Sequence, residues 1–148
     1  MILLSRRSLL AIVAVVDIAL HARPLPVPAK LLAARHHLPP RHLETMLQAL
    51  VRAGILKGMR GPRGGYELAR ERRKITAGEI VRAAMSSTGE DSMPPVPESM
   101  LVDAVVGPIV GEAGEKFLAR LDAVTVDDMC RRAEALPVSE PATADFTI

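Results

Sequence analysis

The sequence of 148 residues predicts a mainly α-helical fold with one small β-hairpin. Apolar residues recur at helical spacing, as in Leu43, Met46, Leu47 and Leu50, and such spacing marks the buried face of a helix. A single glycine-rich turn, residues 61–65, separates two short segments of strand character. Apolar residues make up 49% of the chain, enough for a core, while aromatic residues make up only 2%. This scarcity argues against a carbohydrate site and against a single-strand nucleic-acid surface built on stacked bases.

The first predicted helix spans about residues 5–22, with Ser5 as its N-cap and Pro24 beyond its end. Its predicted apolar stripe consists of Leu9, Ile12, Val13, Val16 and Leu20. Ser5-Arg6-Arg7 before an apolar run also resembles a twin-arginine export signal. Asp17 interrupts this run of 12 residues, and a membrane span needs about 20. We favour the folded helix over the export signal, and we expect a cytoplasmic protein without a membrane partner.

A proline-rich link, residues 24–28, leads to two further predicted helices. The first spans about residues 29–35, with Leu31 and Leu32 facing inward. A tight turn at residues 38–40 leads to the second, over about residues 40–53, which ends at the C-cap Gly54.

The predicted hairpin consists of residues 55–60 and 66–68 around the glycine turn. Thr76 and Glu79 form a capping box that opens a fourth helix ending near Met85. These elements define a first domain over residues 1–85.

The remainder of the chain divides into three predicted parts. Residues 86–97 are polar and then proline-rich, which indicates a linker loop. Residues 98–136 are helical, with a break or kink at Gly107-Pro108 and a last helix that Thr125 caps. Residues 137–148 form a flexible tail.

Charge is distributed unevenly along the chain. Residues 1–85 contain 15 Lys and Arg against 5 Asp and Glu, whereas residues 86–148 contain 4 against 12. Arginine, which makes bidentate contacts to phosphate and guanine, supplies most of the basic residues. A solvated but uneven surface would show the same counts, but the basic half favours a polyanion partner.

Two short helices joined by a tight turn and followed by a hairpin make a winged helix-turn-helix, a fold that binds double-stranded DNA. The helix that starts near residue 40 then enters the major groove, and the hairpin tip approaches the backbone or the minor groove. Arg41 and His42 can donate to guanine or phosphate, and Glu44 can accept from the cytosine amino group. The DNA-binding residues predicted are Arg6, Arg7, Arg41, His42, Glu44, Thr45, Gln48, Arg60, Arg63 and Gly64.

Other sites find little support in the sequence. The spacing of His36, His37 and His42 fits no standard metal motif, so we expect no metal ligands. The single cysteine, Cys130, is either a buried small hydrophobe or a redox-active thiol beside Arg131 and Arg132, and we favour the buried residue. No nucleophile–base pair or phosphate-binding glycine loop is visible, and we expect no enzyme activity.

Residues 4–85 resemble the Rrf2 family of bacterial winged-helix transcription regulators. The similarity rests on Asp17-Ile18-Ala19-Leu20, His42-Leu43-Glu44, Leu50, Ala53-Gly54-Ile55-Leu56, the wing from Arg60 to Leu68, and Ile75-Thr76-Ala77-Gly78-Glu79-Ile80. A weaker similarity continues from Leu121 to Met129.

The resemblance implies a homodimeric regulator, more in keeping with a repressor than an activator, on a partly palindromic DNA operator. It assigns the dimer contact to the long helix after residue 98, base discrimination to Glu44, and minor-groove entry to Arg60. Members of the family that bind an iron–sulfur cluster carry cysteines in the loop after the fourth helix. Residues 86–97 have none, so we expect no cofactor.

Two further departures concern an aromatic position of the first helix, held here by Leu10, and Pro39-Pro40 before the recognition helix. The signal that controls the regulator stays open: a small effector of unknown identity, oxidation of Cys130, or none. A winged helix used for protein contact, with DNA binding secondary or absent, is the alternative function.

Overall fold

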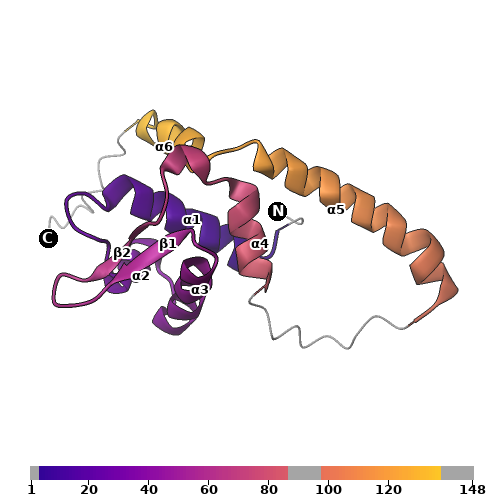
Figure 1. Ribbon diagram of the computed structural model, residues 1–148, viewed down its shortest axis with the longest axis horizontal. Helices are drawn as coiled ribbons and strands as arrows, with labels where there is room; N and C mark the ends of the chain where they lie inside the picture. The colour runs from indigo at the N-terminus through magenta and orange to yellow at the C-terminus, as the bar shows by residue number, and fades with distance from the viewer. Residues whose placement is uncertain (1–3, 87–97, 138–148) are drawn as a thin grey trace, which may run out of the picture.

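The computed structural model describes residues 4–86 and 98–137, and their elements follow the predicted order (Figure 1). The elements are α1 (Arg6–His21), α2 (Ala29–His36), α3 (Pro40–Arg52), β1 (Leu56–Met59), β2 (Gly65–Leu68), a 3-10 turn η1 (Arg72–Lys74), α4 (Ala77–Ser86), a π-helical turn η2 (Val102–Val106), α5 (Gly107–Asp122) and α6 (Val126–Glu134). The fold class predicted from the sequence is confirmed. The predicted linker 86–97 and tail 137–148 fall almost entirely outside the described residues.

Helices α1 to α4 pack around one apolar core. The buried face of α1 consists of Ala11, Ala14, Val15 and Ile18, each 0% exposed. The predicted stripe of α1 is correct only in part: Ile12, Val16 and Leu20 are half-buried and pack against the core, whereas Leu9 is 37% exposed. Small alanines face the core because α3, α4 and α6 all contact this helix. Since these residues belong to the core, the structure supports the folded-helix interpretation of the N-terminal segment.

The start signals predicted for α1, α4 and α6 are confirmed, the last as a capping box at Thr125. The Ser5 side chain accepts a hydrogen bond from the Ser8 amide at the start of α1. Thr76 and Glu79 form a reciprocal capping box before α4. In α2, however, Leu32 is buried but Leu31 is 52% exposed, so one of the two predicted inward residues is wrong.

The hairpin is anchored to the rest of the fold through the link before α2. Strands β1 and β2 pair antiparallel, with Leu56 opposite Leu68 and Met59 opposite Gly65. Val27 adds an isolated bridge to Tyr66, with N–O distances of 2.9 and 2.8 Å. The proline-rich link therefore serves as an extra edge partner of β2, which fixes the wing relative to α2.

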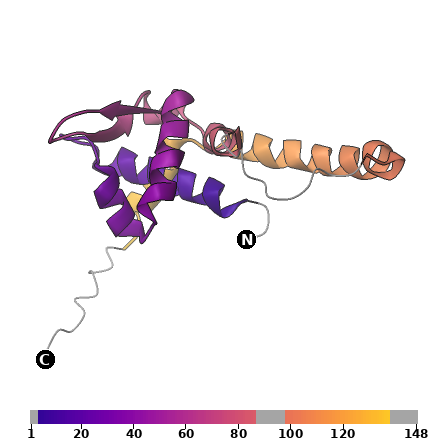
Figure 2. The same ribbon diagram turned by 90° about the horizontal axis from the view of Figure 1, so that it is seen from below.

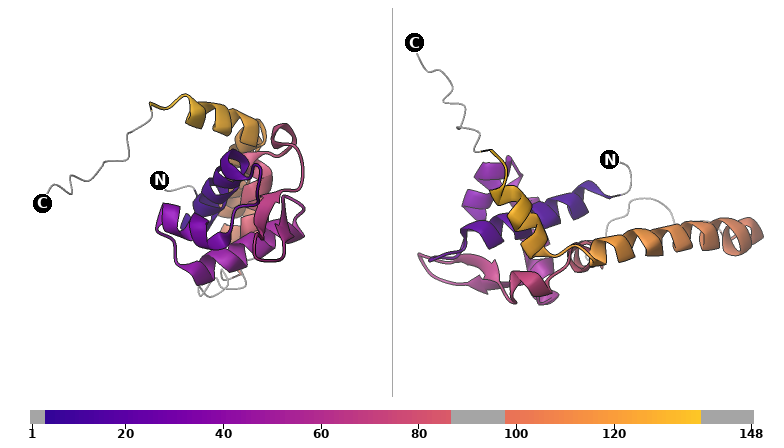
Figure 3. Two further views of the ribbon diagram at one scale, coloured as in Figure 1. Left: turned by 90° about the vertical axis from the view of Figure 1, so that its left-hand side faces the viewer. Right: turned by 90° about the horizontal axis from the view of Figure 1, so that it is seen from above.

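Helix α6 returns to the core of the first domain. Val126 and Cys130 are 0% exposed within the core cluster, and the Val126 amide donates to the Ile75 carbonyl at 2.8 Å. Arg72 on η1 pairs with Asp127 at 2.7 Å. Figure 3 shows α6 against the N-terminal helices. The sequence predicts α6 as part of one helical region with α5, but α6 shares its core with α1 and pairs with η1.

Helix α5 extends away from this body, as Figures 1 and 2 show. Residues 100–122 form one continuous helix, so of the break or kink predicted at Gly107-Pro108 the break is wrong. Instead, the Gly107 amide donates to the Val102 carbonyl, five residues back, in a π-helical turn. This wider turn fits Pro108, which has no amide hydrogen and would clash with a carbonyl in a regular helix.

None of the helices in residues 4–86 and 98–137 combines the length and the apolar character that a membrane crossing requires.

Candidate nucleic-acid interface

Helix α3 exposes a polar face opposite its core face. Leu43, Met46, Leu47 and Leu50 are at most 3% exposed, and their spacing turns the intervening side chains to solvent. The exposed residues include all five predicted for base reading: Arg41, His42, Glu44, Thr45 and Gln48. The Thr45 hydroxyl donates to the Arg41 carbonyl at 3.2 Å. This face therefore offers donors and acceptors in the first three turns of the helix, as a major-groove helix requires.

The orientation of α2, which packs against α3, depends on a buried carboxylate of α1. Asp17, 5% exposed, accepts hydrogen bonds from Arg35 Nε at 2.9 Å and His36 Nε2 at 2.6 Å. Burial raises the pKa of Asp17, but the hydrogen bonds and the charges of Arg35 and His21 outweigh it, so the pKa lies below its usual value. His36 thus has a structural partner in Asp17.

The turn between α2 and α3 has left-handed backbone at His37, with φ of 52°. The Leu38 amide donates back to the Ala33 carbonyl at 3.0 Å and closes the end of α2. Pro39 and Pro40 then start α3, because proline suits the first turn of a helix. This geometry sets α3 across α2 in a helix-turn-helix.

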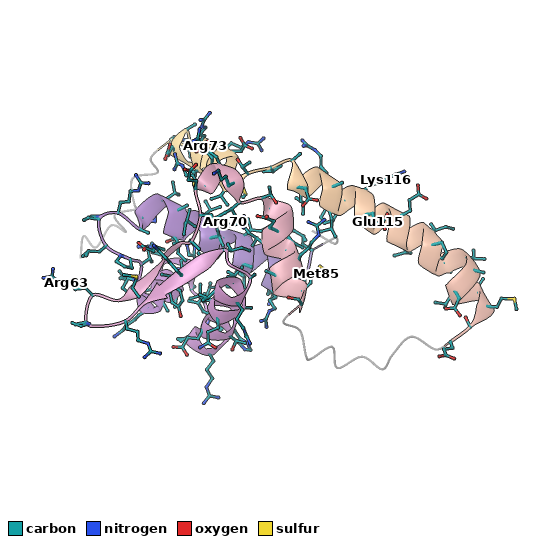
Figure 4. The ribbon with its side chains drawn as sticks, viewed as in Figure 1. Arg63, Arg70, Arg73, Met85, Glu115 and Lys116 are labelled. Atoms are coloured by element: carbon teal, nitrogen blue, oxygen red, sulfur yellow. The ribbon has the colours of Figure 1, made fainter. Side chains whose placement is uncertain are left out.

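The wing carries Arg60 and Arg63 at its exposed tip. Figure 4 shows Arg63 at the end of the hairpin, pointing away from the body. Gly61 has a φ of +110°, which other residues rarely adopt. A Cβ on Gly64 would lie 2.4 Å from the Met59 carbonyl oxygen, so this tight turn requires glycine.

Lys30, which the sequence analysis missed, lies between the wing and α3. It lines one hollow with Arg60 and Tyr66, and a second hollow with Glu44. Burial and then the negative charge of Glu44 raise the pKa of Tyr66, which places that carboxylate near the wing strand. A basic residue in the first turn of α2, after Pro28, was the only signal in the sequence.

The predicted residues fall into three groups. The α3 face and the wing tip, with Gly64, flank Lys30. Arg6 and Arg7 lie apart from the wing, at the start of α1, where they line a groove with His37 and His42. The structure thus joins Arg6 and Arg7 to the recognition helix through His42, and not through the wing.

Cys130 is buried at 0% exposure in α6. Burial raises the pKa of its thiol, against the opposing effect of Arg72. Because the thiolate is the reactive form, the structure favours the core role of this residue over the redox role.

Some members of the family that residues 4–85 resemble bind an iron–sulfur cluster, and such clusters are held by cysteine thiolates. The chain has one cysteine, and it lies in the core. Within residues 4–86 and 98–137, no group of three or more His, Cys, Asp or Glu residues is placed to hold a metal ion. The residues described do not fit an iron or iron–sulfur site.

An exposed recognition helix beside an arginine-bearing wing defines a winged helix-turn-helix protein that binds DNA. The sequence profile of the Rrf2 family, described as an iron-dependent transcriptional regulator, matches residues 4–132. The chain belongs to the Rrf2 family of transcriptional regulators, and it is a DNA-binding transcription regulator of that type.

Individual relatives agree with this assignment. The HTH-type transcriptional regulator slr0846 of Synechocystis is 30% identical over 150 residues, which cover 98% of this chain and 99% of the relative. The protein rrf2 of Nitratidesulfovibrio vulgaris is 32% identical, covering 82% of each chain.

Solved structures show the same fold. The structure of T. potens IscR has a TM-score of 0.69 and 30% identity, covering 90% of this chain and 91% of its own. That of CymR, the global cysteine regulator of B. subtilis, has a TM-score of 0.64 and 26% identity, covering 89% and 98%.

Proposed function

We propose that this chain is a homodimeric repressor that binds a partly palindromic operator without an iron–sulfur cluster and without catalysis. The observation that carries the proposal is the exposed polar face of α3, flanked by the arginine-bearing wing. A lone winged helix reads one half-site, and two copies provide the affinity and the spacing for a palindrome.

We assign base reading to the first turns of α3. Arg41 and His42 donate to guanine or phosphate, Glu44 accepts from a cytosine amino group, and Thr45 and Gln48 contact bases further along the groove. Arg60 enters the minor groove from the wing, where its charge meets the negative potential. Phosphate contacts come from the cations around this face: Arg6, Lys30, Arg41 and Arg63, which are exposed, and Arg7, which is half-buried.

The dimer contact is assigned to η2 and α5. These elements expose large apolar side chains on a helix that projects from the body: Leu101, Val105, Val106, Ile109 and Val110, each at least 45% exposed. An apolar face of this kind on a helix of a water-exposed protein favours association with a partner helix. Gly111 and Gly114 have open space around them, which leaves room for close approach.

The test is selection of bound duplexes from a random DNA pool, at two salt concentrations, with the native chain and Arg60→Ala. We expect enrichment of a palindromic motif that Arg60→Ala abolishes. Each phosphate contact removed, as in Arg63→Gln, is expected to reduce the slope of log affinity against log salt by about 1.

Glu44→Ala provides a separate test of base reading. We expect the variant to bind with relaxed preference at one position of each half-site, while the salt slope stays unchanged. Unchanged preference would contradict the role of Glu44. Absence of any enriched motif with the native chain would favour the alternative, a winged helix used for protein contact.

A further inference from the structure

A groove of about 610 Å³ separates the start of α1 from the turn between α2 and α3 and the first half of α3. Its walls are the apolar side chains of Leu10, Leu38, Leu43 and Met46. Leu43 and Met46 form a buried floor, at 2% and 3% exposure, and Leu10 and Leu38 are half-buried. A cleft of this size falls within the range that small ligands occupy in proteins.

The rim of the groove is basic. Arg6, Arg7, His37 and His42 line it, and none of the residues described along it is Asp or Glu. Arg6 and Arg7 lie on the same face of α1 as Leu10, because they precede it by four and three residues. His42 lies on the same face of α3 as Met46, which follows it by four residues. The groove therefore combines an apolar interior with two arginines in its lining, Arg6, which is exposed, and Arg7, which is half-buried.

We propose that this groove binds a small amphipathic carboxylate, with the carboxylate at Arg6 and Arg7 and an apolar body against Leu43 and Met46. Charge complementarity selects the anionic head, because guanidinium groups pair with carboxylates in a bidentate manner. The apolar walls select the body, since burying alkyl or aryl surface favours binding and a bare inorganic anion gains nothing there.

The groove shares residues with the DNA-binding surface, and this part of the inference rests on the proposed function. His42 belongs to the reading face of α3, and Arg6 and Arg7 are proposed phosphate contacts. A bound carboxylate offsets part of the positive charge of Arg6 and Arg7 and occupies the space between α1 and α3. The ligand and the operator therefore weaken each other's binding, and the carboxylate acts as an inducer.

The binding test uses the full-length protein without DNA and labels the methyl groups of methionine for NMR. Met46 lies in the groove, whereas Met59 and Met85 lie elsewhere and serve as internal references. Octanoate is the probe. Octylamine has the same chain length with a cationic head, and acetate has the head without the chain.

We expect octanoate to shift the Met46 methyl resonance in a saturable manner, with no matching response to octylamine or acetate. Equal responses to octanoate and octylamine, or to octanoate and acetate, would overturn the proposal. This comparison needs only the native chain, so it holds even if a variant fails to fold.

The double variant Arg6→Gln and Arg7→Gln is expected to weaken octanoate binding at least about tenfold, equivalent to about 1.4 kcal/mol. Arg73→Gln is the matched control, because Arg73 is 73% exposed on η1, on the far side of the body (Figure 4). Equal octanoate affinity in the double variant and the control would contradict the assigned head-group site.

Operator binding is then measured with and without saturating octanoate. We expect about a tenfold loss of DNA affinity in the native chain and none with octylamine. Met46 binding without a loss of DNA affinity would overturn the inducer role. If the chain binds no DNA at all, the proposed function fails, while the NMR titration still decides the ligand site.

Discussion

Asp17 joins α1 to α2 through a single buried carboxylate, and the helix-turn-helix depends on it. The side chain is 4% exposed, and Arg35, which holds it, is 34% exposed. A carboxylate removed from water needs a cationic or hydrogen-bonding partner. Removing one member of such a buried pair destabilises the protein, because the other member is left without compensation.

We therefore expect Asp17→Asn to lower the free energy of unfolding by about 2 kcal/mol, a value reduced because Arg35 reaches solvent. Urea denaturation measures the change. Glu115→Gln, on the exposed side of α5, is the matched control and should leave stability within about 0.5 kcal/mol. Equal midpoints for the two variants would contradict the role given to Asp17.

The same carboxylate predicts a pH dependence. Because the pKa of Asp17 in the folded chain lies below its usual 3.8, the stabilisation is complete above that value and is lost as pH falls through the folded pKa. Melting temperatures of the native chain should decline below about pH 4, and those of Asp17→Asn should decline less. Parallel profiles would show that other carboxylates dominate acid unfolding.

Burial of Cys130 also gives a prediction at the scale of one residue. The thiol should react with an aromatic disulfide reagent only after denaturation, because it is 0% exposed and its pKa is raised. Met59→Cys places a thiol at a side chain that is 48% exposed, and this added thiol should react in the native state. Rapid native labelling of Cys130 would restore the redox interpretation.

At the scale of the element, the wing depends on backbone contacts that only glycine permits. A Cβ at Gly64 would lie 2.4 Å from the Met59 carbonyl, whereas one at Gly58 would lie 3.8 Å from the Tyr66 ring, an ordinary contact. The two positions are six residues apart in one hairpin, so they form a matched pair.

Gly64→Ala is expected to displace the wing tip and lower operator affinity about tenfold, or about 1.4 kcal/mol. Gly58→Ala should bind like the native chain. Fluorescence anisotropy with a labelled operator measures both. If both variants bind alike, the geometry of the wing tip does not contribute to affinity.

Most helix boundaries follow from local signals, and the structure departs from them where tertiary contacts decide. The cap at Ser5 and the box at Thr76 act within one turn, so the sequence predicts them correctly. The fully buried face of α1 is not predicted correctly. Helices that pack on several sides of α1 bury its alanines more completely than the larger Leu9 and Ile12. The sequence does not predict the position of Lys30 between the wing and α3, because that position depends on the bridge between Val27 and Tyr66.

At the scale of the whole molecule, the surface proposed for dimer association lies on η2 and α5, which project from the DNA-binding body. Its apolar residues lie on a helix whose exposed side chains, such as Glu115 and Lys116, point into solvent (Figure 4). The body keeps its own core without them, so association and folding should respond separately to substitution on this helix.

Ile109→Glu, at a side chain that is 65% exposed, should leave the melting temperature of the chain at low concentration unchanged. The dimer dissociation constant should rise at least about tenfold, since a charge in an apolar contact is poorly tolerated. Ala119→Glu places the same charge on an exposed position outside the apolar stretch and should have little effect. Sedimentation of the three proteins decides whether α5 forms the dimer contact.

The return of α6 to the core has a consequence for synthesis on the ribosome. Val126 and Cys130 complete a core whose other residues begin at Ala11, so the contacts that close it span most of the chain. Long-range contacts form late, because a large loop must be ordered first. The growing chain therefore exposes an unfinished core until α6 emerges. By then α5, the helix proposed for the dimer contact, has already been made, so under that proposal two nascent chains can meet before either body is closed.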